Sequence, residues 1–102
     1  MIKIVCMCGA GVGSSLLFVM GVQRVIKRNG YNESDFMYEQ GDVQTGKALA
    51  KFADILITTP AFQDAIDPDG PPAVFVKNIF SEDEIEEKLM PVLKEVIASK
   101  AK

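Results

Sequence analysis

Histidine and tryptophan are both absent from this chain of 102 residues. The lack of an imidazole excludes histidine acid–base catalysis, a phosphohistidine and any histidine-ligated metal site. Long basic runs are missing too, because 11 Lys and Arg residues stand against 14 Asp and Glu residues and the net charge is -3. A nucleic-acid binder usually carries a basic patch or stripe, so we expect neither DNA nor RNA as a partner.

Cysteine is scarce, since Cys6 and Cys8 are the only two thiols. With one residue between them they close no loop large enough to stabilise a secreted fold, so we expect reduced thiols and a cytoplasmic protein. No charge occurs between Lys3 and Arg24. That run resembles a membrane span, but four glycines and two serines interrupt it and favour a strand, a loop and a helix without membrane insertion.

The hydrophobic pattern alternates between strands and helices along the whole chain. We predict an α/β fold, a single three-layer domain over residues 1–102, with a four-stranded parallel sheet flanked by helices on both faces. Asp42 should open the helix that starts at about residue 43. The last helix should begin at a capping box formed by Ser81 and Glu84, and Pro91 should kink it or shift its start. The predicted strands cover residues 2–7, 34–39, 54–60 and 73–76, and the predicted helical segments cover residues 16–28, 43–52, 61–65 and the chain after Ser81.

In such sheets a ligand binds beyond the carboxyl ends of the strands. Thr58 and Thr59 lie at one of these ends and could donate hydrogen bonds to a bound anion, although threonine is also an ordinary strand residue. Val12, Phe62 and Phe80 follow strand ends and could contact a partner, or simply belong to the core.

The segment after the first strand carries the chemistry, since it places a thiol, Cys8, before several glycines and a helix N-terminus. Glycines let main-chain N–H groups face an anion, and the helix dipole adds positive potential that favours the thiolate at Cys8. We therefore predict a phosphate-binding loop with Cys8 as nucleophile and with these residues around the phosphoryl group: Gly9, Ala10, Gly11, Val12, Gly13, Ser14 and Ser15.

Other interpretations of this loop stay open. The glycines could serve strand-to-helix packing alone. The chain could also be a non-catalytic module that binds an anion or a partner. A mononucleotide loop would need a lysine after Gly13, and a dinucleotide fingerprint would need different glycine spacing and a larger domain. Cys6 lies within the predicted strand, where an inert packed thiol is the simpler interpretation.

A cysteine phosphatase or arsenate reductase of the low-molecular-weight type is the closest rival, because its loop has the pattern C-x5-R-[ST]. Here Ser14 stands where the arginine should be. Without a guanidinium to clamp the transferring phosphoryl group, the loop suits transfer to a partner better than hydrolysis. The Asp67-Pro68 pair is then a turn rather than a general-acid loop.

The run C-G-x-G-x-G-S-S from Cys8 to Ser15 resembles the enzyme IIB subunits of the sugar phosphotransferase system (PTS), most closely the ascorbate-type branch of the ascorbate/galactitol group. The resemblance extends over essentially the full length. It implies that a phosphohistidine on a IIA partner phosphorylates Cys8, and that Cys8 passes the group to an ascorbate-like or galactitol-like sugar held by the membrane permease IIC. It also implies a phosphotransferase peripheral to that permease. Because helix amides can stabilise the charge of a phosphoryl group on sulfur, the residues present require no metal or cofactor.

Overall fold

The computed structural model describes residues 2–8, 12–67 and 69–100. Its four strands are β1 (Ile2–Met7), β2 (Phe36–Gly41), β3 (Ile55–Thr58) and β4 (Ala73–Phe75). All neighbouring pairs are parallel, and the strand order is β2-β1-β3-β4. The α/β fold with a four-stranded parallel sheet is therefore confirmed, with β1 as a central strand.

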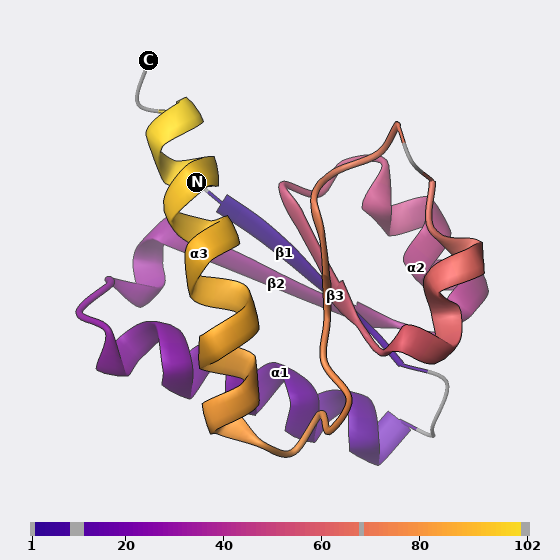
Figure 1. The fold of residues 1–102 in the computed structure, drawn as a ribbon, viewed down its shortest axis with the longest axis horizontal. Helices are drawn as coiled ribbons and strands as arrows, with labels where there is room; N and C mark the ends of the chain where they lie inside the picture. The colour runs from indigo at the N-terminus through magenta and orange to yellow at the C-terminus, as the bar shows by residue number, and fades with distance from the viewer. Residues whose placement is uncertain (1, 9–11, 68, 101–102) are drawn as a thin grey trace.

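In the described part of the chain, two α-helices and two 3₁₀ segments connect these strands, and a third α-helix follows β4. The helices are α1 (Val12–Arg28), α2 (Val43–Ala50) and α3 (Glu82–Lys100), and the short segments are η1 (Glu33–Asp35) and η2 (Pro60–Ala65). Figure 1 shows α1 and α3 together on one side of the sheet and α2 on the other. The three layers that the sequence predicted are therefore present.

Strand alternation divides the core into two unequal parts. Ile4, Cys6 and Cys8 point from β1 and its end into the larger part, where α1 contributes Phe18 and Val22 among others. The smaller part consists of three buried residues with a few partly buried neighbours, because α2 has only eight residues and η2 only six. The buried residues of this smaller part are Val5, Met7 and Leu56.

Local signals fixed several element ends as predicted. Asp42 caps α2 by accepting a hydrogen bond from the Thr45 N–H at 2.8 Å. The Ser81 hydroxyl likewise accepts from the Glu84 N–H at 3.3 Å. The predicted return bond of a capping box is wrong, however, because the Glu84 carboxylate instead accepts from the main-chain N–H groups of Lys77 and Asn78.

Two helix predictions also need correction. α1 begins at Val12, not at residue 16, so the predicted loop loses four residues to the helix. α3 begins directly after Ser81 and continues through the exposed Pro91 to Lys100, so Pro91 does not shift the start of the helix. β2 begins two residues later than predicted, because Asn32 caps η1 through a bond from the Ser34 N–H.

Candidate functional site

Cys8 is the first residue after β1, at the carboxyl end of a central strand. Its main-chain N–H donates to the Gly41 carbonyl at 3.1 Å, which continues the pairing of β1 with β2 for one more residue. The backbone of Cys8, the predicted nucleophile, is thus held by the sheet. It lies at the carboxyl end of the strands, where parallel sheets usually bind their ligands.

The Cys8 side chain is buried, with 5% of the residue exposed, and it packs in the larger core together with Cys6. In this conformation the sulfur offers little surface to a phosphoryl donor.

Cys6 has no access to solvent. Burial, and next the proximity of Cys8, raise the pKa of the Cys6 thiol far above its usual range. A thiol held in its neutral form is a poor nucleophile. Cys6 therefore serves as a packed core residue, in agreement with the simpler interpretation of the sequence.

The predicted phosphate-binding residues fall into two groups. Gly9, Ala10 and Gly11 lie outside the described residues. Val12, Gly13, Ser14 and Ser15 form the first turn of α1, and only their backbone is described. The first four N–H groups of a helix have no partner within it, so the N-terminus of α1 supplies main-chain donors and a positive dipole end only four positions after Cys8.

Thr58 has a structural contact of its own. It is fully buried, and its hydroxyl donates to the main-chain carbonyl of Met7 at 2.8 Å. The bond joins the ends of β1 and β3 directly before Cys8. Thr59 is partly exposed and makes no side-chain cap hydrogen bond to η2.

The predicted partner contacts differ from one another. Phe80 is 58% exposed, whereas Phe62 is partly buried against the smaller part of the core. The side chain of Val12 lies outside the described residues.

α1 carries apolar side chains on two faces, and one of these faces is exposed. Leu16, Leu17 and Met20 are 50%, 51% and 40% exposed. The buried face of α1 consists instead of Phe18, Val19, Val22, Val25 and Ile26. The three- and four-residue spacing of this second set was the signal that could have separated the two faces. The first two turns of α1 therefore carry an exposed apolar surface close along the chain to Cys8.

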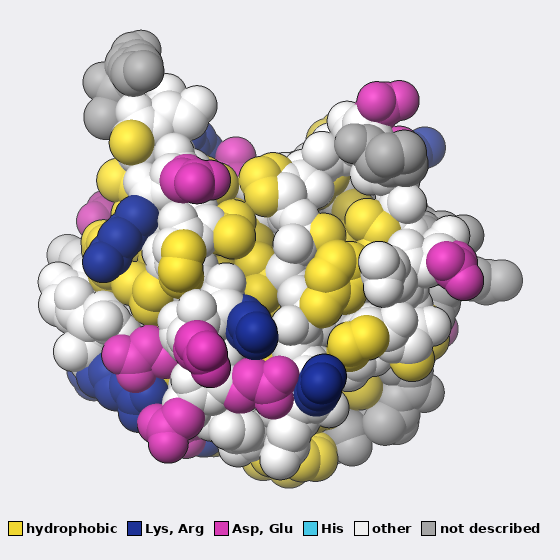
Figure 2. All heavy atoms as spheres, in the orientation of Figure 1, with side chains coloured by type: hydrophobic (Ala, Val, Ile, Leu, Met, Phe, Trp, Pro, Cys, Tyr) yellow, Lys and Arg dark blue, Asp and Glu magenta, His cyan; other side chains and the backbone are white. Residues whose placement is uncertain are grey.

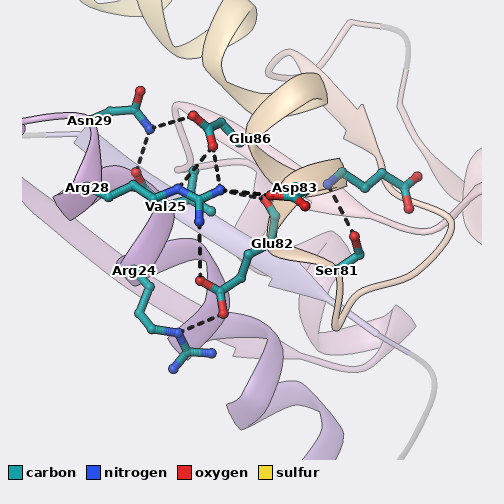
Figure 3. A network of polar contacts seen from close by, with 9 residues as sticks. Arg24, Val25, Arg28, Asn29, Ser81, Glu82, Asp83 and Glu86 are labelled. Atoms are coloured by element: carbon teal, nitrogen blue, oxygen red, sulfur yellow. Dashed lines mark hydrogen bonds and ion pairs between the residues drawn. The ribbon is translucent and has the colours of Figure 1, made fainter.

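Both arginines of the chain are bound to α3, as Figure 3 shows. Arg24 donates to Glu82 at 2.9 Å, and Arg28 pairs with Glu82, Asp83 and Glu86. These ion pairs join α1 to α3, and they leave neither guanidinium directed at Cys8. The structure therefore offers no arginine clamp of the phosphatase kind.

Within the described ranges no cluster of three or more Cys, Asp or Glu side chains is suited to hold a metal ion. In the same ranges we find no helix with both the length and the apolar character needed to cross a membrane. The uncharged N-terminal run thus divides between β1 and the beginning of α1.

The fold is similar to a solved structure, the lactose-specific IIB component domain of the phosphoenolpyruvate:carbohydrate PTS from Streptococcus pneumoniae. The TM-score is 0.58 at 12% sequence identity, with 95% of each chain covered. At this identity the likeness concerns the fold alone.

Sequence comparison gives a more specific result. The chain is 28% identical over 93 residues to the ascorbate-specific PTS system EIIB component of Mycoplasma pneumoniae. This alignment covers 90% of this chain and 95% of that protein. A family model described as the lactose/cellobiose-specific IIB subunit of the PTS matches residues 3–90. The match covers most of the chain, and the protein therefore belongs to the IIB subunits of the sugar phosphotransferase system, which are phosphotransferases.

Proposed function

We propose that this protein is a cysteine phosphocarrier that accepts a phosphoryl group on Cys8 from a phosphohistidine of a IIA partner and passes it to a sugar bound by a IIC permease. The position of Cys8 carries the proposal. It is the first residue after a central strand, and α1 begins four residues later. The thiol of Cys8, the main-chain N–H donors of the first turn of α1 and the positive end of the helix dipole therefore all lie within one short stretch of the chain.

The chemistry requires two displacements at phosphorus. In the first, the Cys8 sulfur forms a P–S bond while the P–N bond of the donor breaks, and the thiol proton is released. In the second, a sugar hydroxyl forms a P–O bond while the P–S bond breaks, and the hydroxyl proton leaves. The residues from Gly9 to Ser15 are proposed to surround the phosphoryl oxygens with main-chain N–H groups, which would stabilise their charge in both steps.

Transfer instead of hydrolysis is supported by the engagement of both arginines. Because Arg24 and Arg28 pair with acidic residues of α3, no guanidinium of this chain is available to accelerate attack by water on the phosphocysteine. The low exposure of Cys8 acts in the same direction, since it limits contact between the sulfur and solvent.

Partner docking is proposed for the exposed side chains of Leu16, Leu17 and Met20 on the first turns of α1. Exposed apolar side chains next to a site typically mark a protein contact. The IIA and IIC partners would both need Cys8, so we infer that they bind in turn. For the sugar we propose an ascorbate-like substrate, which rests on the full-length similarity to the ascorbate-specific EIIB component.

The direct test is to incubate the protein with a phosphorylated IIA protein of the ascorbate type and to measure its intact mass. The expected product carries one phosphoryl group on the peptide that contains Cys8. Cys8→Ser should abolish the product, whereas the matched variant Cys6→Ala should keep it. A label that survives Cys8→Ser would contradict the proposal. If a lactose-type IIA protein phosphorylated Cys8 and an ascorbate-type IIA protein did not, the sugar assignment would be contradicted but the carrier role would not.

A further inference from the structure

A pocket of about 290 Å³ opens on the side of the sheet that faces α2, opposite to the Cys8 side chain. We call it the α2 pocket. It lies where the short α2 and η2 leave the smaller core incompletely covered. Its lining residues are Met7, Ala50, Lys51, Leu56, Ile66, Asp67, Gly70 and Pro71.

The walls of this pocket are mainly apolar. Met7 and Leu56 come from the buried cluster under α2, and Ala50 and Ile66 pack against that cluster from the end of α2 and from the residue after η2. An apolar cavity of roughly 150 Å³ can hold a benzene molecule. The α2 pocket therefore has room for an aromatic or branched aliphatic group and for a short polar extension. Figure 2 shows apolar side chains gathered on the face between α3 and the α2 side of the molecule.

The mouth of the pocket carries one charge of each sign. Lys51 is the residue directly after α2, Asp67 follows η2, and both are exposed. Among the described residues neither forms an ion pair, so the two charges do not neutralise each other directly. One oxygen of Asp67 accepts from the Asp69 N–H at 2.9 Å, which fixes the turn that holds this carboxylate.

We propose that the α2 pocket binds a small zwitterion with an apolar side chain, of the class of aromatic or branched-chain α-amino acids. The apolar group would lie over Met7 and Leu56, the carboxylate of the ligand would face Lys51, and its ammonium group would face Asp67. A simple anion would be repelled by Asp67, and a simple cation would be repelled by Lys51. A zwitterion is favoured because it can place an opposite charge beside each of the two residues. This proposal does not depend on the phosphocarrier role.

Met7 connects the pocket to the site. Its side chain is fully buried and packs against Gly46 of α2, its carbonyl accepts the Thr58 hydrogen bond, and Cys8 follows it in the chain. Because Met7 lines the pocket, we expect a ligand there to change the environment of its methyl group, which can report binding.

The experiment titrates three probes that share a phenyl ring into the full-length protein labelled with ¹³C at the methionine methyl groups. The probes are L-phenylalanine, 3-phenylpropanoate and 2-phenylethylamine. We expect saturable shifts of the Met7 methyl signal with L-phenylalanine, and at least about fivefold weaker binding of the two singly charged probes, as loss of an ion pair worth about 1 kcal/mol implies.

Charge variants test each contact separately. Lys51→Gln should weaken L-phenylalanine and 3-phenylpropanoate but not 2-phenylethylamine, and Asp67→Asn, which keeps the acceptor of the turn, should weaken L-phenylalanine and 2-phenylethylamine. Lys27→Gln on the exposed end of α1 is the matched control and should change nothing. Absence of a saturable Met7 shift, equal affinity for the three probes, or tighter binding of a singly charged probe would each overturn the proposal. Because the readout does not involve phosphoryl transfer, failure here is distinct from failure of the carrier function.

Discussion

The Thr58 hydroxyl donates a hydrogen bond of 2.8 Å to the carbonyl of Met7, the residue that precedes the proposed phosphocysteine. Thr58 is fully buried, so its loss leaves an acceptor at the end of β1 without this donor. We expect Thr58→Val to lower the free energy of unfolding by about 1 kcal/mol. Because the end of β1 positions Cys8, we also expect slower phosphoryl acceptance. Urea unfolding and the rate of phosphorylation by a IIA protein measure the two effects.

Thr59→Val is the matched control for this prediction. Thr59 is partly exposed and makes no side-chain cap hydrogen bond, so the variant should unfold within about 0.5 kcal/mol of the parent. If Thr58→Val instead kept its stability and lost only phosphorylation, Thr58 would act on the phosphoryl group itself and the structural role would be wrong.

Leu17 tests the partner surface on α1. It is 51% exposed, so Leu17→Asp should not disturb the core, but it would place a charge within the proposed contact with IIA. We expect the KM for phosphorylated IIA to rise by about tenfold, equivalent to about 1.4 kcal/mol, with little change in thermal unfolding. Steady-state phosphorylation at varied IIA concentration gives the KM.

Phe52→Asp provides the comparison for Leu17→Asp. Phe52 is 76% exposed and lies two residues beyond the C-terminal end of α2, outside the proposed contact surface on α1. Its KM should stay at the parent value. Equal effects of the two variants would show that the contact is not specific to α1.

Gly46 tests how closely α2 packs on β1. A Cβ at this position would lie 2.7 Å from both Cγ and Sδ of Met7 and 3.2 Å from its Cβ. Met7 is fully buried, and its Cγ and Sδ would both have to shift away from the new methyl group, so overpacking should outweigh the gain in helix propensity. We expect Gly46→Ala to lower the free energy of unfolding by about 1–2 kcal/mol in denaturant unfolding.

Gly21→Ala is the opposite case on α1. The nearest atom to its added Cβ is Ile85 Cδ1 at 3.4 Å, an ordinary contact. Helix propensity should therefore dominate and raise the free energy of unfolding by up to about 1 kcal/mol. A stabilising Gly46→Ala would mean that Met7 can move aside at little cost.

The sequence was informative where a single local signal decides the structure. The apolar run of residues 2–7 became β1, and Asp42 and Ser81 cap helices as predicted. Alternation of strands and helices was sufficient for the parallel sheet, and the position of Cys8 after β1 followed from it.

The sequence does not indicate features that contacts between distant residues decide. The exposure of Leu17 depends on which face of α1 meets the sheet and α3, and a mixed apolar pattern does not specify that face. The contact of Thr58 with Met7 spans 51 positions, so no local pattern could indicate it. Glu84 likewise satisfied the capping motif, yet its carboxylate turned to the loop after β4.

That Glu84 carboxylate makes the loop before α3 sensitive to pH. It accepts hydrogen bonds from the N–H groups of Lys77 at 2.6 Å and Asn78 at 2.9 Å, and these bonds hold the pKa of Glu84 below its ordinary value of 4.5. Since the folded pKa is lowered, the carboxylate contributes stability above pH 4.5, and this contribution is lost as the pH falls through the folded pKa. We expect the amide signals of Lys77 and Asn78 to titrate together in an NMR pH series, with a midpoint below 4.5. Glu84→Gln should remove this titration, whereas Glu87→Gln on the exposed side of α3 should leave it unchanged. A midpoint at or above the ordinary value of 4.5 would show that the two hydrogen bonds do not favour the charged carboxylate.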